Sequence, residues 1–215
     1  MTVKLETGLP EKCLGPADAK NFLVYLHGMD YPNLSTQERT NRAILVRLAT
    51  QLQFRIALPR AAKACPTKPE SRCWGWNLDD HEVEATKKLV DTAAKECFPK
   101  NAKYGLLGFS NGGYLLSKTF RDCTFKEHFA NGAWLILVGA ARRDGPLVSP
   151  PDSLQGCGSL TILSGDSDQF NSDSKQNLIS QLKLKGADAE EIPYTGGHIL
   201  PEEPLHDLLQ MRFTP

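Results

Sequence analysis

The residues with the clearest capacity for chemistry stand at 108–112, where the sequence reads Gly-Phe-Ser-Asn-Gly. The apolar run YGLLGF leads into this motif, and the helical pattern YLLSKTF follows it. A serine at a sharp turn between a strand and a helix has its hydroxyl raised clear of the sheet, at the positive end of the helix. This context predicts that Ser110 is a nucleophile. The alternative is a glycine-rich turn in which Ser110 merely caps the helix.

A nucleophilic serine needs a base, and the base needs a group that orients it. Among the five histidines, His198 has the best setting, because two glycines precede it in a loop just before the last helix. The acid is expected after the strand at 160–163, where LTILSGDSDQF offers Asp166 and Asp168. The order serine, aspartate, histidine is that of α/β-hydrolases.

The chain resembles the α/β-hydrolase superfamily and, within it, the small phospholipase/carboxylesterase group that includes acyl-protein thioesterases. The resemblance runs from residue 22 to the end and is carried by four motifs in order, which are LHG at 26–28, GFSNGG at 108–113, G-x-x-D at 165–168 and GGH at 196–198. In that family the aspartate of G-x-x-D is the acid of the triad, which favours Asp168 over Asp166. The family often has glutamine where Asn111 stands, a departure of little consequence if only the backbone N–H is used.

The resemblance also implies an oxyanion hole. His27 and Gly28 are similar to the family's oxyanion loop, so the two donors would be the backbone N–H groups of Met29 and Asn111. His27 itself is then expected to hold the loop rather than to catalyse. Together these residues imply a serine hydrolase that cleaves esters or thioesters through an acyl-enzyme, with no metal or organic cofactor.

The substrate is less well defined by the sequence. The segment 65–77 (CPTKPESRCWGWN) follows a predicted strand and carries Trp74 and Trp76, which either line an acyl-binding wall or pack over the sheet edge. We expect a small-molecule or acyl-group substrate, such as a short ester, a protein-borne acyl group or a polymer end. The alternatives are a poly(hydroxyalkanoate) depolymerase, a feruloyl-type esterase, a peptidase or amidase, and a non-catalytic binding module.

The elements that must position these residues alternate along the chain. Short apolar runs predict strands at 22–26, 54–58, 104–109, 134–138, 160–163 and, more weakly, 190–194. Amphipathic patterns predict helices at 35–53, 80–97, directly after 110, 173–185 and from 204, the first opened by an S-x-x-E capping box at Ser35 and Glu38. This alternation predicts one α/β domain over 1–215, with a mainly parallel sheet and helices on both faces. The connection 139–159 is too short for a cap domain.

Charge and hydropathy exclude several classes of protein. The 25 Lys and Arg residues balance 25 Asp and Glu residues, so the chain lacks the basic excess that nucleic-acid binding needs. The longest apolar stretch, at 133–141, is far shorter than the roughly 20 residues that span a bilayer. The sequence leaves the oligomeric state open.

Cysteine usage bears on the compartment. Residues 1–20 lack the basic start and apolar core of a secretory leader, so we expect a cytoplasmic protein or one whose leader is absent. The six cysteines are either buried free thiols or disulfides, with Cys65–Cys73 and Cys97–Cys123 as candidate pairs. Disulfides favour a periplasmic or secreted protein over a cytoplasmic one.

Overall fold

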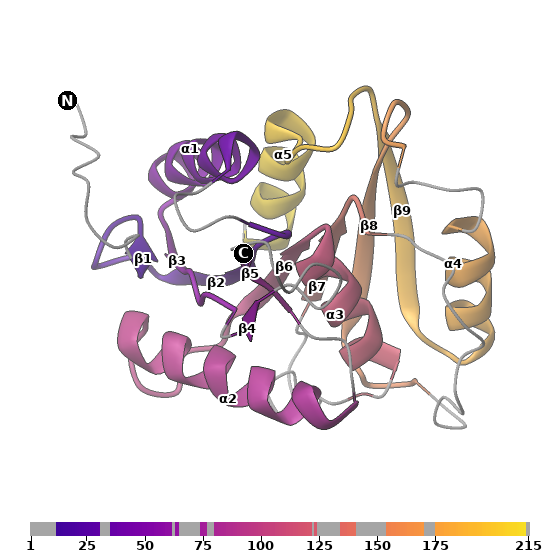
Figure 1. The fold of residues 1–215 in the computed structure, drawn as a ribbon, viewed down its shortest axis with the longest axis horizontal. Helices are drawn as coiled ribbons and strands as arrows, with labels where there is room; N and C mark the ends of the chain where they lie inside the picture. Colours follow the sequence, from indigo (N-terminus) through magenta and orange to yellow (C-terminus); the bar gives the residue numbers. More distant parts are fainter. Residues whose placement is uncertain are drawn as a thin grey trace.

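The computed structural model describes residues 12–30, 35–61, 63–64, 74–76, 80–121, 123, 134–140, 154–169 and 175–213. Its main sheet has seven strands in the order β1-β3-β2-β6-β7-β8-β9 (Figure 1). These strands are β1 (Cys13–Leu14), β2 (Asn21–Leu26), β3 (Phe54–Ala57), β6 (Gly105–Phe109), β7 (Trp134–Val138), β8 (Ser159–Gly165) and β9 (Asp188–Tyr194). Only β1 runs antiparallel to its neighbour, so six carboxyl ends meet at one edge of the sheet.

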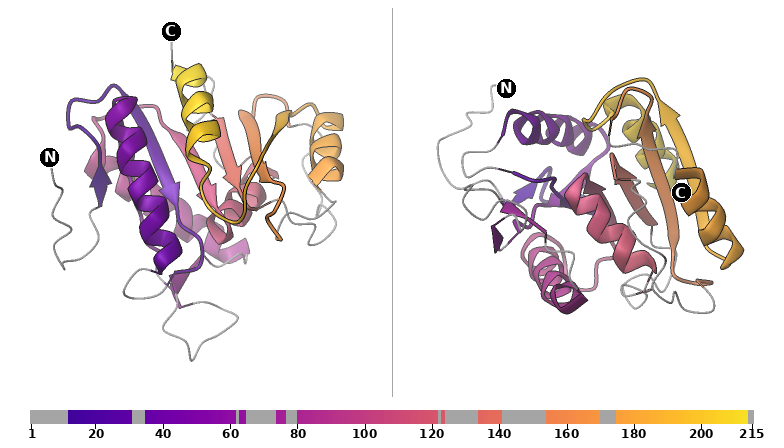
Figure 2. Two further views of the ribbon diagram at one scale, coloured as in Figure 1. Left: turned by 90° about the horizontal axis from the view of Figure 1, so that it is seen from above. Right: turned by 45° about the vertical axis from the view of Figure 1, so that its right-hand side comes forward.

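In the described parts of the chain, five helices cover the two faces of this sheet. They are α1 (Thr36–Gln51), α2 (Asp80–Cys97), α3 (Asn111–Arg121), α4 (Lys175–Leu184) and α5 (Glu202–Phe213). Helices α1 and α5 lie on one face, and α2, α3 and α4 lie on the other (Figure 2). The predicted fold class, a mainly parallel sheet with helices on both faces, is confirmed.

The two cores on either side of the sheet follow from the period of two in each strand. In β2, Val24 and Leu26 point into the core with α2, α3 and α4, whereas Leu23 and Tyr25 point into the core with α1 and α5. Because both faces are covered, the strand is apolar throughout except for its first residue. This is why the parallel strands were easy to recognise in the sequence.

Three short strands were not predicted. One is β1; the others, β4 (Lys63–Ala64) and β5 (Trp74–Gly75), pair antiparallel in a separate two-stranded sheet. Each has two residues, too few for a hydropathy period to show.

The start of α1 matches half of the predicted capping box. The Ser35 side chain accepts a hydrogen bond from the Glu38 N–H at 3.1 Å. The Glu38 carboxylate does not return this contact, because it accepts instead from Tyr25 and Arg42. The Ser35 N–H donates to Asp30 at 2.8 Å, so the loop after β2 supplies the second half of the cap.

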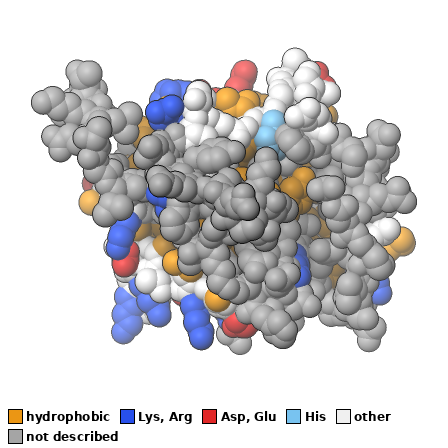
Figure 3. Space-filling view, viewed as in Figure 1, with side chains coloured by type: hydrophobic (Ala, Val, Ile, Leu, Met, Phe, Trp, Pro, Cys, Tyr) orange, Lys and Arg blue, Asp and Glu red, His pale blue; other side chains and the backbone are white. Residues whose placement is uncertain are grey.

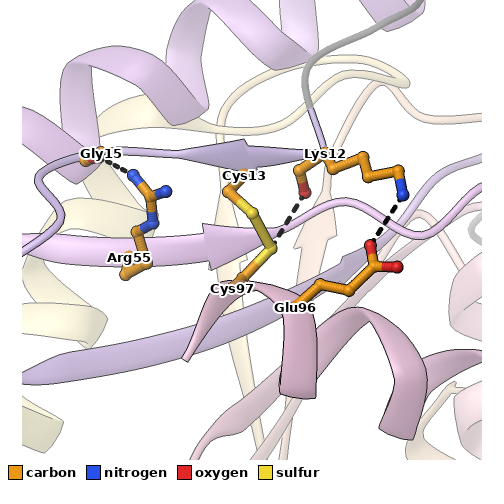
Figure 4. Close-up of a disulfide and its surroundings, with 6 residues drawn as sticks. All are labelled: Lys12, Cys13, Gly15, Arg55, Glu96 and Cys97. Atoms are coloured by element: carbon orange, nitrogen blue, oxygen red, sulfur yellow. Dashed lines mark hydrogen bonds and ion pairs between the residues drawn. A yellow bond between two sulfur atoms is a disulfide. The ribbon is translucent and has the colours of Figure 1, made fainter. Parts of the chain in front are cut away.

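The predicted pairing of Cys97 with Cys123 is wrong. Cys97 is bonded to Cys13, with 5.7 Å between the Cα atoms, and Cys123 is bonded to Cys157, with 5.4 Å between them. The unpredicted strand β1 explains the first bond, because it brings Cys13 to the C-terminal end of α2, where Lys12 and Glu96 also pair (Figure 4). The pair Cys65 and Cys73 lies outside the described residues.

The last turn of α2 carries both signs of charge, because Lys95 stands beside Glu96, whose carboxylate pairs with Lys12. In the space-filling view, Lys and Arg side chains gather at the lower left, on the side of the molecule where α2 lies (Figure 3). The cation in the last turn of α2 is Lys95. Cations at the C-terminal end of a helix are stabilised by the helix dipole.

Within the described ranges, no helix is both long and apolar enough to cross a bilayer.

Candidate active site

Ser110 occupies a strained turn between β6 and α3. Its φ angle is +50°, a left-handed conformation that a serine rarely adopts. The Ser110 N–H donates to the Val138 carbonyl at 2.9 Å, and the Ser110 carbonyl accepts from Tyr114, inside α3. A Cβ atom at Gly108 would lie 2.7 Å from the Gly112 carbonyl oxygen, so the turn requires a glycine there. These are the features that the G-x-S-x-G motif predicted.

The loop after β2 runs against this turn. The Gly112 N–H donates to the His27 carbonyl at 3.1 Å. A Cβ at Gly28 would lie only 3.2 Å from the Cβ of Ser110. Met29 follows and is 45% exposed. Asn111 is the first residue of α3, where backbone N–H groups have no partner within the helix. The two predicted oxyanion donors therefore belong to backbone segments that flank Ser110.

His27 is a structural part of this loop. Its Nε2 accepts from the Ala61 N–H at 3.1 Å, and its Nδ1 lies 2.5 Å from the Gly28 carbonyl oxygen. Since a carbonyl can only accept, these partners define a neutral imidazole with its proton on Nδ1. Burial lowers the pKa of His27 to about 4. The geometry agrees with the expectation that this side chain holds the loop.

The structure describes the side chain of Trp76 but only the backbone of Trp74. Trp76 is only 2% exposed, and its indole N–H donates to the His27 carbonyl at 2.8 Å. This is the packing alternative, because little of the ring surface remains for a ligand. The backbone of Trp74 forms part of β5, and its side chain lies outside the described residues.

The Asn111 side chain has a role that sequence reasoning did not assign. Its Oδ1 accepts from the Trp76 N–H at 2.5 Å, and its Nδ2 donates to the Trp76 carbonyl at 3.2 Å. This pair of bonds joins the start of α3 to the segment after β5. The expectation that only the backbone N–H of Asn111 matters is therefore incomplete.

His198 and Asp168 form a pair at the ends of β9 and β8. His198 Nδ1 lies 2.9 Å from Asp168 Oδ2, and the carboxylate is fully buried while the imidazole is 15% exposed. Asp166, the alternative acid, is exposed and has other hydrogen-bond partners. Its Oδ1 accepts from the Gly196 N–H at 3.0 Å and from Ser167 at 2.9 Å, and these hydrogen bonds lower the pKa of Asp166.

Tyr194, at the end of β9, supports the loop that carries His198. Its hydroxyl lies 3.1 Å from the Gly197 carbonyl oxygen and 3.2 Å from the Ile199 carbonyl oxygen, so these two acceptors share its single proton. Burial, together with the nearby charge of Asp168, raises the pKa of Tyr194 to about 12. The phenol thus remains a donor throughout the physiological range.

Gly139 and Phe109 connect the serine turn with the histidine pair. Gly139 directly follows the carbonyl that binds the Ser110 N–H. A Cβ at Gly139 would lie 2.7 Å from His198 Nδ1 and 2.9 Å from Asp168 Oδ2. The Phe109 ring lies 4.8 Å from the His198 ring, between centroids. Sequence reasoning missed both residues, although a glycine directly after the run WLILV was a visible signal.

The described residues offer no evident metal-binding group. Across the described ranges, no group of three or more His, Cys, Asp or Glu side chains is arranged to hold a metal ion. The groups that the described residues bring together at this edge of the sheet are a serine, a histidine–carboxylate pair and backbone N–H groups.

No protein-family model and no curated protein sequence matches the chain. Solved structures match its fold. The carboxylesterase from Mesorhizobium loti has a TM-score of 0.66 at 19% identity, and the match covers 94% of this chain and 93% of that one. Zea mays acyl-protein thioesterase 2 has a TM-score of 0.62 at 16% identity, covering 93% and 95%. The Bacillus cereus carboxylesterase has a TM-score of 0.59 at 19% identity, covering 94% and 93%.

These matches establish that the chain has the α/β-hydrolase fold, and they confirm the predicted resemblance to esterases and thioesterases at the level of the fold. No cap domain is evident among the described residues.

Proposed function

We propose that the chain is a serine hydrolase that cleaves carboxylic esters or thioesters through an acyl-enzyme. The observation that carries the proposal is the arrangement at one sheet edge: a serine at φ +50° after β6, and a histidine bonded to a buried aspartate after β9 and β8. This combination is typical of a nucleophile, its base and the group that orients the base.

In the proposed reaction, Ser110 attacks the acyl carbonyl carbon while His198 takes the hydroxyl proton on Nε2. The hydrogen bond that Nδ1–H donates to Asp168 keeps Nε2 turned towards the serine, and the carboxylate stabilises the imidazolium that forms. His198 then gives the proton to the leaving alcohol or thiol. Water attacks the acyl-enzyme by the same route, and the serine is restored.

The developing negative charge on the carbonyl oxygen needs donors fixed in advance. We assign this role to the backbone N–H groups of Met29 and Asn111, which lie on the two segments that flank Ser110. Removing one such donor from an oxyanion hole typically costs about 10²–10³ in turnover. The contacts from Gly112 to His27 and from Asn111 to Trp76 keep these segments together.

The two tryptophans that the sequence offered as substrate contacts receive different roles in the proposal. We assign Trp76 to the support of the oxyanion loop, because its ring is buried and its indole N–H is bonded to His27. Trp74 stays a predicted contact for the acyl chain. Small-molecule esters and protein-borne acyl groups are both within the proposal.

The proposal is tested by hydrolysis of p-nitrophenyl esters from acetate to decanoate. Wild type is compared with Ser110→Ala and with Ser117→Ala, a matched control in α3. We expect turnover in wild type and in the control, and a loss of about 10³-fold or more in Ser110→Ala. Equal activity in all three proteins would remove Ser110 from its role. Faster cleavage of aminoacyl-nitroanilides than of esters would instead indicate an amidase.

A further inference from the structure

A buried polar chain of contacts joins α1 to the loop that carries His198. Asn41 is fully buried, although it lies on the apolar side of an amphipathic helix. A buried amide is costly unless its polar atoms are hydrogen-bonded. Both ends of this side chain have partners, and each partner lies on a different element.

The side chain of Asn41 links the histidine loop to β2 through two hydrogen bonds. Its Oδ1 accepts from the Leu200 N–H at 3.1 Å, and its Nδ2 donates to the Tyr25 hydroxyl at 3.4 Å. The Tyr25 hydroxyl in turn donates to Glu38 at 2.9 Å, and Glu38 also accepts from Arg42 at 2.8 Å. Because Oδ1 faces an N–H donor and Nδ2 faces a hydroxyl oxygen, the amide of Asn41 is held in one orientation, with its oxygen towards the histidine loop.

Gln37 makes a second contact from the same helix. Its Nε2 donates to the His198 carbonyl at 2.6 Å. Together, Gln37 and Asn41 hold the backbone at His198 and at Leu200, the residue two positions later. Both of these bonds go to backbone groups, so we expect the two side chains to act by placing the backbone from which the imidazole projects.

The same part of α1 also holds the oxyanion side of the site. Asp30, directly after Met29, accepts from the Ser35 N–H at the N-cap of α1. Tyr25 belongs to β2, the strand that leads into this loop. The first turns of α1 therefore contact both halves of the proposed machinery.

We propose that Asn41 and Gln37 are positioning residues: they fix the backbone of His198 relative to the oxyanion loop and so align the base with Ser110. This inference rests on the proposed function. Small displacements of a catalytic group lower turnover steeply, by up to about 10²-fold for 1 Å. Substrate binding depends much less on the imidazole, so the effect falls on kcat rather than on KM.

The first test compares Asn41→Leu and Gln37→Met with Arg39→Ala, a control on the exposed side of the same helix. We expect kcat for a p-nitrophenyl ester to fall about tenfold or more in Asn41→Leu and about threefold or more in Gln37→Met, by loss of alignment. We expect KM to change by less than about threefold, and the control to match wild type. Gln37 is only partly buried, so Gln37→Met keeps the test available if Asn41→Leu fails to fold.

The second test separates positioning from general damage. Each substitution is repeated in a His198→Ala background, and residual hydrolysis is measured as a double-mutant cycle. A residue that acts through His198 has no further effect once the imidazole is gone. An undiminished effect in that background would overturn the proposal, as would single variants whose kcat stays within twofold of wild type. Failure of wild type to show Ser110-dependent hydrolysis would instead refute the proposed function, and this inference with it.

Discussion

Two histidines, His27 and His198, each follow a strand of the same sheet, and their surroundings are opposite. His27 is 1% exposed, and both of its ring nitrogens face backbone groups. The imidazole of His198 is partly exposed, and its Nδ1 faces the buried carboxylate of Asp168. Both side chains are fixed, but only one has a charged partner.

This difference separates a structural histidine from a proposed base. Burial outweighs the nearby charge of Asp30 and lowers the pKa of His27 to about 4, so its imidazole stays neutral and acts as a rigid bridge. A carboxylate on Nδ1 stabilises an imidazolium, which is the form that a base must reach during turnover. The residue type is the same, and the partner decides the chemistry.

The largest effect is expected at the base itself. We predict that His198→Asn lowers kcat for a p-nitrophenyl ester by about 10⁴-fold, since no other group takes the serine proton. Thermal unfolding should change little, because the imidazole is near the surface. A variant that kept more than about a tenth of wild-type turnover would contradict the comparison.

The two aspartates provide a matched pair. We predict that Asp168→Asn lowers kcat by about 10³-fold or more, because it loses the charge that orients and stabilises the imidazolium. Asp166→Asn should cost less than about tenfold, since Asp166 contacts only the loop backbone and Ser167. Steady-state kinetics on both variants give the ratio. The reverse order would assign the acid to Asp166.

At His27 the effect is expected on stability. The unfolded chain takes up a proton below pH 6.5, whereas folded His27 stays neutral until about pH 4. Its stabilisation is complete above pH 6.5 and is lost as the pH falls towards 4, by about 3 kcal/mol in all. We predict that His27→Gln, which cannot titrate, removes this part of the acid sensitivity.

Urea unfolding of both proteins at pH 7 and at pH 4 measures this difference. Burial raises the pKa of Glu38 to about 6, so its contribution has the opposite sign, but it is common to both proteins and cancels. Identical pH dependence in wild type and His27→Gln would show that His27 titrates normally and is not the rigid bridge described above.

The smallest effect is expected at the support of the oxyanion loop. Trp76→Phe keeps most of the buried ring but removes the N–H that donates to His27. The loss of one such hydrogen bond costs about 1 kcal/mol. We therefore predict a fall in kcat of up to about fivefold with an unchanged acyl chain-length profile. A changed profile would return Trp76 to the acyl-binding wall.

The long elements of the fold were predictable from the sequence, and the short ones were not. Strands such as β2 and β6 are buried on both faces, so their apolar runs are unmistakable. Strand β1 has two residues and no such signal, yet it determines the partner of Cys97. Disulfide pairing therefore depended on an element that hydropathy cannot reveal.

In the candidate site, the sequence motifs identified the proposed catalytic residues but not the residues that support them. The motifs at Ser110 and His198 were readable because glycines flank both of them, and the carboxylate partner of His198 is Asp168, the aspartate that the resemblance favoured. The supports at Asn41 and Gly139 were not found. Their roles arise from contacts between segments far apart in the chain, which spacing along the sequence does not encode.

The central claim, that Ser110 is the activated nucleophile of a histidine–aspartate pair, is tested most directly by covalent labelling. Wild type, Ser110→Ala and His198→Asn are treated with a fluorophosphonate, and intact masses and peptide maps are recorded. We predict a single adduct on Ser110 in wild type, none in Ser110→Ala and greatly slowed labelling in His198→Asn. An adduct on another residue, or labelling of His198→Asn at the wild-type rate, would contradict the account.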